Sequence, residues 1–448
     1  MLHSLKRNSR RRARAGLLAG AAVVALGVGG VSAGSAAAAP SCTGSNITGE
    51  GASLQKVAQQ QVWTGKFATL CGGAPTVTYP GNGSGAGLAS WDFNGSDGTP
   101  FETSKAFTAS DDAPTTTQIN NAKTAAGGTT DVLVIPVTQT AIGVAINPPA
   151  NCDVEEITNQ QLESIFRGNL KFWGKITTAF GTGCEASPIT RVVRFDGSGS
   201  TYQFKNYLST INSAKLACTE PSRSWAELRP IETVNNPNTT WPENGKGGCP
   251  AGTLSPVVTA GANGGGALVN KVDSTDGSIG YAALPDIEIN KDPGTHWLRV
   301  QNNGVTKLSK AAFAEPLVES NNSANCGGAQ YVVPAAGRTG TGTGINVDWS
   351  QVFGANNKIG GEDYPLCTIT YDMSLTKYGN VSTVPGGATF TEGQFTTVRD
   401  YLTEYITATQ GQNDIANAGK WYAALPSGVA PATDVLGAAR LAASKIGF

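Results

Sequence analysis

The sequence predicts an α/β protein, and two observations support that prediction. Runs of apolar and β-branched residues typical of strands alternate along the chain with stretches typical of helices. The 57 glycines are scattered between these segments as turn residues and form no low-complexity tract. The strand-like runs are PTVTY (75–79), DVLVIPV (131–137), AIGVAIN (141–147), RVVRF (191–195) and GSIGYAAL (277–284).

Two helices are expected from periodicity and capping. In the stretch LQKVAQQQVWTGKF, Leu54, Ala58 and Val62 fall on one face of a helix. Before the run NQQLESIF, Thr158 is followed three residues later by Gln161, which is the pattern of a capping box. Strand and helix therefore alternate in the way that defines the α/β class.

Residues 1–39 have the composition of a secretory signal peptide. A basic start is followed by an apolar run from Ala15 to about Val31 and by small residues up to Ala39, which offer a cleavage site. We therefore expect a protein that is cleaved near Ala39 and is secreted or associated with the cell envelope. A lipid anchor on Cys42 is disfavoured, because it would leave an odd number of thiols. No other stretch approaches the roughly 18 apolar residues that a membrane span needs.

All eight cysteines lie after this leader. An even number of cysteines in an exported chain, without C-x-x-C spacing, indicates disulfides. Many pairings are possible for eight cysteines, and we assume pairing between neighbours along the chain. These neighbours are Cys42 and Cys71, Cys152 and Cys184, Cys218 and Cys249, and Cys326 and Cys367.

The chain without its leader is acidic and holds one histidine. It has 26 basic and 33 acidic side chains, since six basic residues leave with the leader. This acidic balance makes nucleic acid an unfavourable partner. His296 is the one histidine that remains, so most zinc sites and a serine-histidine-aspartate triad are disfavoured. We expect neither a metal nor a cofactor.

Hydroxyl residues and glycines gather at three strand-to-helix turns. Ser53 lies at the first turn, Ser84 at the second, and Ser198 and Ser200 at the third. The start of a helix offers unpaired backbone N–H groups and the positive end of its dipole, and glycine lets a ligand approach the backbone. Each turn taken alone is most simply a cap, and Ser53 is expected as an N-cap. Together the three turns predict a cradle for an oxyanion.

Charged residues accompany these turns. Arg194 and Asp196 precede the third turn, where an arginine supplies a charge-assisted donor and an aspartate can orient it, although a surface ion pair is the simpler alternative. Asp111 and Asp112 precede a proline, a pattern that is also common at a helix start. The glycine clusters GANGGGALVNK and GRTGTGTG lack the ending of a P-loop, and no serine-hydrolase motif surrounds the serines.

In their order along the chain, four segments resemble the PstS-like family, the phosphate-binding proteins of the high-affinity phosphate ABC transporter. GEGASL is similar to the family's G-A-G-A-T-F, YPGNGSGAG to Y-x-G-x-G-S-x-G-G, FTASDDAP to F-G-A-S-D-A-P, and RFDGSGST to R-x-D-G-S-G-T. Later segments agree, among them LESIFRGNLKFWGKI, GSIGYAAL and YPLCTITYDM. The resemblance places phosphate ligands on Ser53, Leu54, Ser84, Asp111, Arg194, Asp196, Ser198, Gly199 and Ser200.

This chain departs from the family pattern at a few positions. Leu54 stands in place of phenylalanine, Ser200 in place of threonine, and Asp112 is an additional residue. The chain also has four expected cysteine pairs and extra sequence around 321–363.

The resemblance implies the two-lobed periplasmic-binding-protein fold of type II, with the ligand cleft between lobes that are joined by a hinge of two chain crossings. Lobe one would combine residues 42–140 with 283–448, and lobe two would be 141–282. The implied function is capture of inorganic phosphate for a membrane ABC permease, by a protein that is not an enzyme; we expect a monomer. The alternatives are a secreted phosphatase-like member of this fold, a binder of another oxyanion or phosphorylated ligand, and an adhesion protein that has lost the ligand.

Overall fold

The computed structural model describes most of the chain after residue 38. The expected signal peptide, except for Ala39, lies outside the described residues, as do Cys218, Cys249 and most of the extra sequence at 321–363. The described residues are 39–95, 101–150, 152–176, 184, 186–217, 223–228, 253–302, 313–327, 331, 333, 349, 352, 363–381, 389–407, 409–428 and 434–448.

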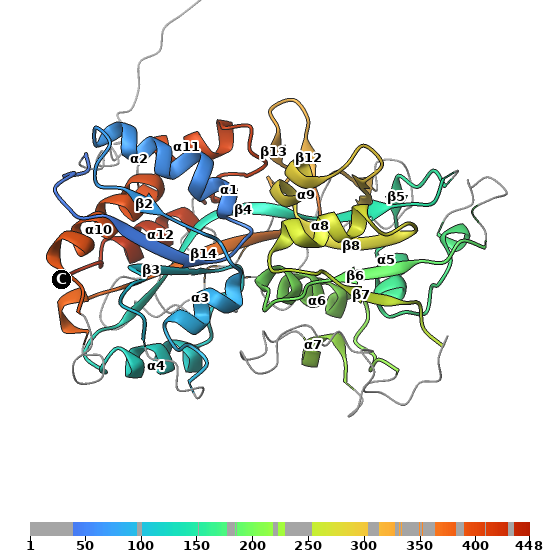
Figure 1. The fold of residues 1–448 in the computed structure, drawn as a ribbon, viewed down its shortest axis with the longest axis horizontal. Helices are drawn as coiled ribbons and strands as arrows, with labels where there is room; N and C mark the ends of the chain where they lie inside the picture. Colours follow the sequence, from blue (N-terminus) through green and yellow to red (C-terminus); the bar gives the residue numbers. More distant parts are fainter. Residues whose placement is uncertain are drawn as a thin grey trace, which may run out of the picture. The chain divides into compact units, whose positions relative to one another are not determined.

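Within the described ranges, a nine-stranded mixed sheet is the main framework (Figure 1). Its strands are β1 (Ile47–Gly51), β2 (Val77–Thr78), β3 (Phe107–Ser110), β4 (Val132–Asn147), β6 (Thr190–Val193), β7 (Val257–Thr259), β8 (Ser278–Ala283), β9 (His296–Trp297) and β14 (Cys367–Leu375). The order is β2-β1-β3-β14-β4-β8-β6-β7, and β9 pairs with β4. The outer strands are parallel to their neighbours, whereas β14 and β4 pair antiparallel at the centre. The predicted α/β class is confirmed.

Strand β4 joins two runs that the sequence analysis treats as separate strands, 131–137 and 141–147. The polar residues between them, Thr138, Gln139 and Thr140, do not end the strand. Their backbone stays paired with β14, and their side chains donate hydrogen bonds of 2.7–2.9 Å to backbone carbonyls of the segment 421–424. Because each polar group has a partner, one strand can continue through this point.

The polar middle of β4 also separates two hydrophobic clusters. The first contains the beginning of β4 with β1, β3 and most of β14. The second contains the end of β4 with β6 and β8, and it continues past residue 283 to include Leu298, Val300 and Ala314. Strand β14 belongs to both clusters, since Cys367 lies in the second and Ile369 in the first. The paired strands β4 and β14 therefore link the two cores.

Helices pack on both cores. Their bounds are α1 (Lys56–Ala58), η1 (Gln59–Trp63), α2 (Thr64–Leu70), α3 (Ser84–Ser90), α4 (Thr116–Ala125), α5 (Asn159–Phe166), η2 (Trp173–Lys175), α6 (Gly199–Ile211), α7 (Trp225–Leu228), α8 (Gly265–Asp273), α9 (Leu284–Asn290), η6 (Tyr378–Asn380), α10 (Glu392–Thr407), α11 (Thr409–Asn417) and α12 (Val435–Ala443). Small sheets are formed by β5 (Glu156–Ile157), β10 (Arg299–Gln301) and β11 (Phe313–Ala314), and by β12 (Leu317–Val318) and β13 (Ser323–Ala324).

The helix expected at 54–67 starts two residues later than predicted. Leu54, Ala58 and Val62 are buried together, as their spacing predicts. Ser53 is not the N-cap, because its backbone carbonyl and not its side chain accepts from Lys56. The middle turn, η1, is a π-helical turn. The other capping prediction is confirmed, since Thr158 and Gln161 form a reciprocal capping box on α5.

Three disulfides join neighbouring cysteines: Cys42–Cys71, Cys152–Cys184 and Cys326–Cys367. They confirm the assumed pairing for the six cysteines that the structure describes. Within the described ranges, no helix is both long enough and apolar enough to cross a membrane.

Candidate anion-binding site

Strand-to-helix turns bring most of the expected site residues together. Asp111 follows β3, Ser84 begins α3, and Arg194 to Ser200 connect β6 to α6. The polar side chains among them are at least nine-tenths buried, whereas Phe195 in the same turn is exposed; the buried ones are Ser84, Asp111, Arg194, Asp196, Ser198 and Ser200. The turns meet because Gly85 donates a backbone hydrogen bond of 3.0 Å to the carbonyl of Gly197.

Asp111 is the centre of the cluster. Its Oδ2 accepts a hydrogen bond of 3.1 Å from Ser200, and its Oδ1 accepts one of 3.0 Å from Thr370 on β14. Its backbone N–H donates to the hydroxyl of Ser84 at 3.1 Å. Burial raises the pKa of Asp111 to about 6, although these hydroxyl donors and the charge of Arg194 act in the opposite direction. The carboxylate is therefore ionised at pH 7 and above, in a place that is almost free of solvent.

Arg194 is oriented by Asp196, as the sequence analysis anticipates for this pair. Its Nε donates to Oδ1 of Asp196 at 2.7 Å, and its Nη2 donates to Oδ2. Burial alone would lower the pKa of Arg194, but the charge and hydrogen bonds of Asp196, together with the charge of Asp286, outweigh burial and the pKa is raised. The pair is buried rather than exposed, so the alternative of a surface ion pair is wrong. The Nη1 group has no acceptor among the described residues and can serve a bound anion.

The start of α6 approaches the Asp111 turn very closely. Ser198 caps the helix, because its hydroxyl accepts from the N–H of Thr201 at 3.2 Å. A Cβ placed on Gly199 would lie 2.7 Å from Oγ of Ser84 and 2.8 Å from Cβ of Asp111. Only a glycine leaves room for this contact between the two turns.

Ser53 and Leu54 occupy different positions relative to this cluster. Ser53 is buried and faces Gly264, whose added Cβ would lie 3.9 Å from the Cβ of Ser53. Gly264 in turn donates its N–H to Oδ1 of Asp196 at 3.3 Å, so Ser53 lies at the edge of the cluster. The side chain of Leu54 packs in the first hydrophobic cluster, and its backbone carbonyl accepts from Tyr422 at 2.5 Å.

A further acidic residue, Asp286, lies beside the same groups. Its Oδ2 would be 1.9 Å from a Cβ placed on Gly265, at the start of α8. Burial raises its pKa to about 7; Arg194 acts in the opposite direction and Asp111 reinforces the rise. None of the described residues donates a hydrogen bond to its carboxylate, and its side chain is mostly buried. In the sequence LPDIEIN, Asp286 is an ordinary acidic residue in the first turn of a helix. The local sequence therefore does not identify it as a candidate site residue.

Neither His296 nor a metal-binding cluster forms a second chemical site among the residues that the structure describes. The ring of His296 on β9 is half-buried, and its Nε2 lies 3.0 Å from the carbonyl of Val154. Among the described residues, no group of three histidine, cysteine or acidic side chains is arranged to hold a metal ion.

The arrangement of two cores joined by β4 and β14 is the two-lobed α/β fold of the periplasmic binding proteins of type II. Residues 36–397 match a family model described as a PBP superfamily domain. The chain therefore belongs to the PBP superfamily, and the expected fold class is confirmed. No curated protein matches the chain in sequence.

Solved structures of phosphate-binding proteins share this fold. One is a high affinity periplasmic phosphate-binding protein, PfluDING, bound with phosphate. It is 21% identical to this chain in sequence, and the TM-score is 0.57. The match covers 85% of this chain and 91% of PfluDING. A phosphate-binding protein from Stenotrophomonas maltophilia is 19% identical, covers 88% and 93%, with a TM-score of 0.58. A human phosphate binding apolipoprotein is 19% identical, covers 85% and 92%, with a TM-score of 0.53. At these identities the likeness concerns the fold.

Proposed function

We propose that this protein captures inorganic phosphate outside the cytoplasm and delivers it to a membrane ABC permease. The observation that carries the proposal is the buried carboxylate of Asp111, placed among hydroxyl, arginine and backbone donors. The names of the structural neighbours and the leader-like first 39 residues support it.

The donors suit any tetrahedral oxyanion, and the carboxylate provides the selection. Phosphate near neutral pH keeps at least one proton, which an ionised Asp111 accepts as a hydrogen bond. Sulfate has no proton and would set two negative oxygens against each other in a desolvated site. We therefore propose phosphate, bound by Ser53, Ser84, Arg194, Ser198, Gly199, Ser200 and the backbone at Leu54, with Asp196 holding Arg194 and Asp111 accepting the proton.

The lobes proposed for closure follow the two cores. The predicted crossing at 140/141 coincides with the polar middle of β4, between the two hydrophobic clusters. The predicted second crossing at 282/283 is less well supported, because Leu298, Val300 and Ala314 pack in the second cluster. We therefore propose β14 as the second crossing. Closure then brings Ser84 and Asp111 from one lobe against Arg194 and Ser200 from the other.

Binding without catalysis is part of the proposal, as are export, a monomeric state, and function without a metal or a cofactor. The alternative of a secreted phosphatase is tested with p-nitrophenyl phosphate. Release of p-nitrophenol at a rate that depends on enzyme concentration, and that disappears when Arg194 is replaced, would favour the enzyme instead.

The deciding experiment is calorimetric titration of the purified mature protein with phosphate and with sulfate. Wild type should bind phosphate and show no measurable heat with sulfate. Asp111→Asn keeps the shape of the side chain, removes its charge and adds a donor. The preference for phosphate over sulfate should therefore become smaller, chiefly because sulfate now binds. Asp276→Asn, at an exposed position, is the matched control and should behave as wild type. If wild type binds no phosphate, the proposed function is wrong.

A second outcome concerns the assignment of the carboxylate alone. If Asp111→Asn still rejects sulfate and binds phosphate as wild type does, Asp111 is not the selecting group. Asp112 and Asp196 then become the residues to replace next.

A further inference from the structure

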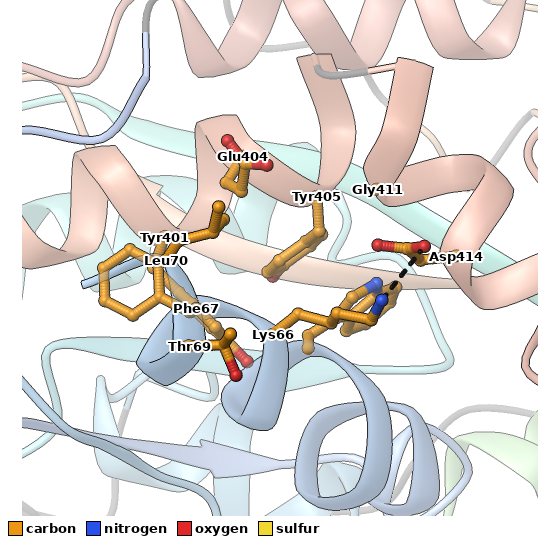
Figure 2. A pocket seen from close by; sticks show the side chains of 10 residues that line it. Lys66, Phe67, Thr69, Leu70, Tyr401, Glu404, Tyr405, Gly411 and Asp414 are labelled. Carbon is orange, nitrogen blue, oxygen red and sulfur yellow. Dashed lines mark ion pairs between the residues drawn. The ribbon is translucent and has the colours of Figure 1, made fainter. Parts of the chain in front are cut away.

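A pocket of about 210 Å³ lies where η1 and α2 meet α10 and α11 (Figure 2), and none of its lining residues belongs to the candidate anion site. Drug-sized ligands occupy pockets of roughly 300 Å³ or more, so this volume suits a smaller molecule. The lining residues come from four helical segments that pack in the first core. The argument below uses Trp63, Lys66, Phe67, Tyr401, Glu404, Tyr405 and Asp414.

The inner wall of the pocket is aromatic. The ring of Trp63 stacks on that of Tyr405 with centroids 4.1 Å apart, and Phe67 meets Tyr401 edge to face at 5.3 Å. All four side chains are at most 2% exposed. The two tyrosine hydroxyls donate into the protein core, one to Gln59 and one to Asp372. These residues therefore offer ring carbons rather than hydroxyls to a ligand.

One polar atom of Trp63, a residue that lines the pocket, has no partner among the described residues. The indole Nε1 of Trp63 is buried, and none of the described residues accepts a hydrogen bond from it. An unpaired buried N–H is unfavourable, and a ligand acceptor that reaches it from the pocket, with a small shift of the covering side chains, would relieve that penalty. Trp63 is also the last residue of η1, and isolated π-helical turns recur at functional sites. The donor and the unusual turn thus coincide at the pocket.

The mouth of the pocket is acidic. Lys66 pairs with Asp414 through a contact of 3.5 Å between Nζ and Oδ1, as the dashed line in Figure 2 marks. Glu404 on α10 forms neither an ion pair nor a side-chain hydrogen bond with any described residue. Partial burial and then the charge of Asp414 raise its pKa. The carboxylate of Glu404 can therefore take a cationic partner, which would lie next to aromatic rings that also attract cations.

We propose that this pocket is a second ligand site, for a small amine that has an apolar or aromatic body and a hydrogen-bond acceptor. The ammonium group pairs with Glu404, the body lies against Trp63 and Phe67, and the acceptor receives the N–H of Trp63. The site does not depend on the proposed phosphate function, because it shares no residue with the anion-binding cluster.

Three small probes separate the parts of this proposal, with NMR titration of the mature protein as the measurement. L-phenylalanine methyl ester has the ammonium group, the ring and the ester acceptor. Methyl 3-phenylpropanoate lacks the ammonium group, and 2-phenylethylamine lacks the acceptor. The first probe should bind about fivefold more tightly than either of the others, since each of them loses one polar contact.

Two variants locate the contacts. Glu404→Gln should lower the affinity for L-phenylalanine methyl ester to that for methyl 3-phenylpropanoate. Trp63→Phe should lower it to the affinity for 2-phenylethylamine. Glu392→Gln lies on the same helix, away from the pocket, and should change nothing. Equal affinity for all three probes, unchanged binding in Glu404→Gln, or no binding up to the solubility limit would each overturn the proposal. Because Glu404 is partly exposed, its variant is expected to fold even if Trp63→Phe does not.

Discussion

Ser200, in the first turn of α6, donates its hydroxyl hydrogen to Oδ2 of Asp111 across 3.1 Å, so two distant parts of the sequence share one buried bond. Gln203, one turn further along α6, donates to the backbone carbonyl of the same aspartate at 3.0 Å. The position of α6 therefore sets the surroundings of Asp111. Under the proposed function, any shift of α6 changes both the donors around a bound anion and the hydration of the carboxylate that selects it.

This dependence can be tested with Gly199→Ala. The added methyl carbon would lie 2.7 Å from the backbone nitrogen of Asp112 and from Oγ of Ser84, closer than Cβ atoms approach other heavy atoms. Overpacking of this kind costs about 1–3 kcal/mol. The two turns should separate, and phosphate affinity should fall about tenfold or more, which is roughly 1.4 kcal/mol or above.

The control for this prediction is Gly261→Ala, since an added methyl group there has no atom within 4 Å. Calorimetric titration with phosphate and far-ultraviolet circular dichroism should be run on both variants. A Gly199→Ala protein that folds and binds phosphate with wild-type affinity would show that the contact is not required.

The site could be anticipated from the sequence where its chemistry is local. Ser84, Ser198 and Arg194 lie in short motifs whose glycines and hydroxyls already define a strand-to-helix turn. Asp286 could not be found in this way, because its role arises from the packing of α9 against α8, which no local pattern encodes. The position of Ser53 shows the reverse case, in which a local pattern misleads. The pattern around Ser53 predicts an N-cap, but the chain makes one more turn before the helix begins.

The fold shows the same division between local and distant causes. The alternation of strands and helices was readable, since apolar periodicity is a local property. The continuity of β4 was not, because Thr138 and Thr140 are satisfied by carbonyls of Ala423 and Trp421, far along the chain. Polar residues that interrupt an apolar run indicate a loop when the distant partners of their side chains are not known.

A second prediction concerns the pH dependence of stability, through Asp372. This carboxyl group on β14 is fully buried, accepts from Tyr405 and from Gln59, and has its pKa raised to about 7 by burial. Between about pH 4 and pH 7 the native state therefore holds a proton that the unfolded chain releases. The group's contribution to the free energy of unfolding falls as the pH rises through this range, by at most about 1.4 kcal/mol per unit, and is constant above it.

Asp372→Asn removes that titration. Urea unfolding of the ligand-free protein at about pH 5 and about pH 8 should show a smaller loss of stability in the variant than in wild type. Asp111 and Asp286 titrate in both proteins, so they do not affect the difference. Asp276→Asn, which is exposed, should follow wild type. Parallel pH profiles for Asp372→Asn and wild type would contradict this assignment.

A third prediction concerns the disulfides. Cys326 and Cys367 close a loop with a sequence separation of 41, and Cys367 is the first residue of β14. Closing a loop of this length stabilises a protein by about 2–4 kcal/mol. Replacing both cysteines by alanine should lower the free energy of unfolding by this amount, measured in urea. Thiol titration of the denatured, unreduced wild type should find essentially none, and two or more reactive thiols per chain would be inconsistent with fully paired cysteines.

The last prediction rests on the proposed function and concerns Asp286. At about pH 8.5 this carboxyl, with its pKa of about 7, is ionised and lies near Arg194, the group that is expected to hold the anion. A negative charge there opposes a negatively charged ligand. Asp286→Asn should therefore increase phosphate affinity at high pH, by up to about tenfold for one unit of coupling. Near pH 5.5 the wild-type carboxyl is protonated, and the substitution should have little effect.

Proton linkage distinguishes this effect from a general change in the site. If Asp286 ionises in the free protein, phosphate binding near pH 7 should be accompanied by proton uptake, because the bound anion raises the pKa of a neighbouring carboxyl. Calorimetry in buffers of different ionisation enthalpy measures that uptake, which should be smaller in Asp286→Asn than in wild type and in the exposed control Asp276→Asn. Helix capping is the competing explanation, because Asp286 lies against the start of α8 and would be stabilised there by the helix dipole. In that case the substitution lowers the free energy of unfolding but leaves both the proton uptake and the pH dependence of phosphate affinity as they are in wild type.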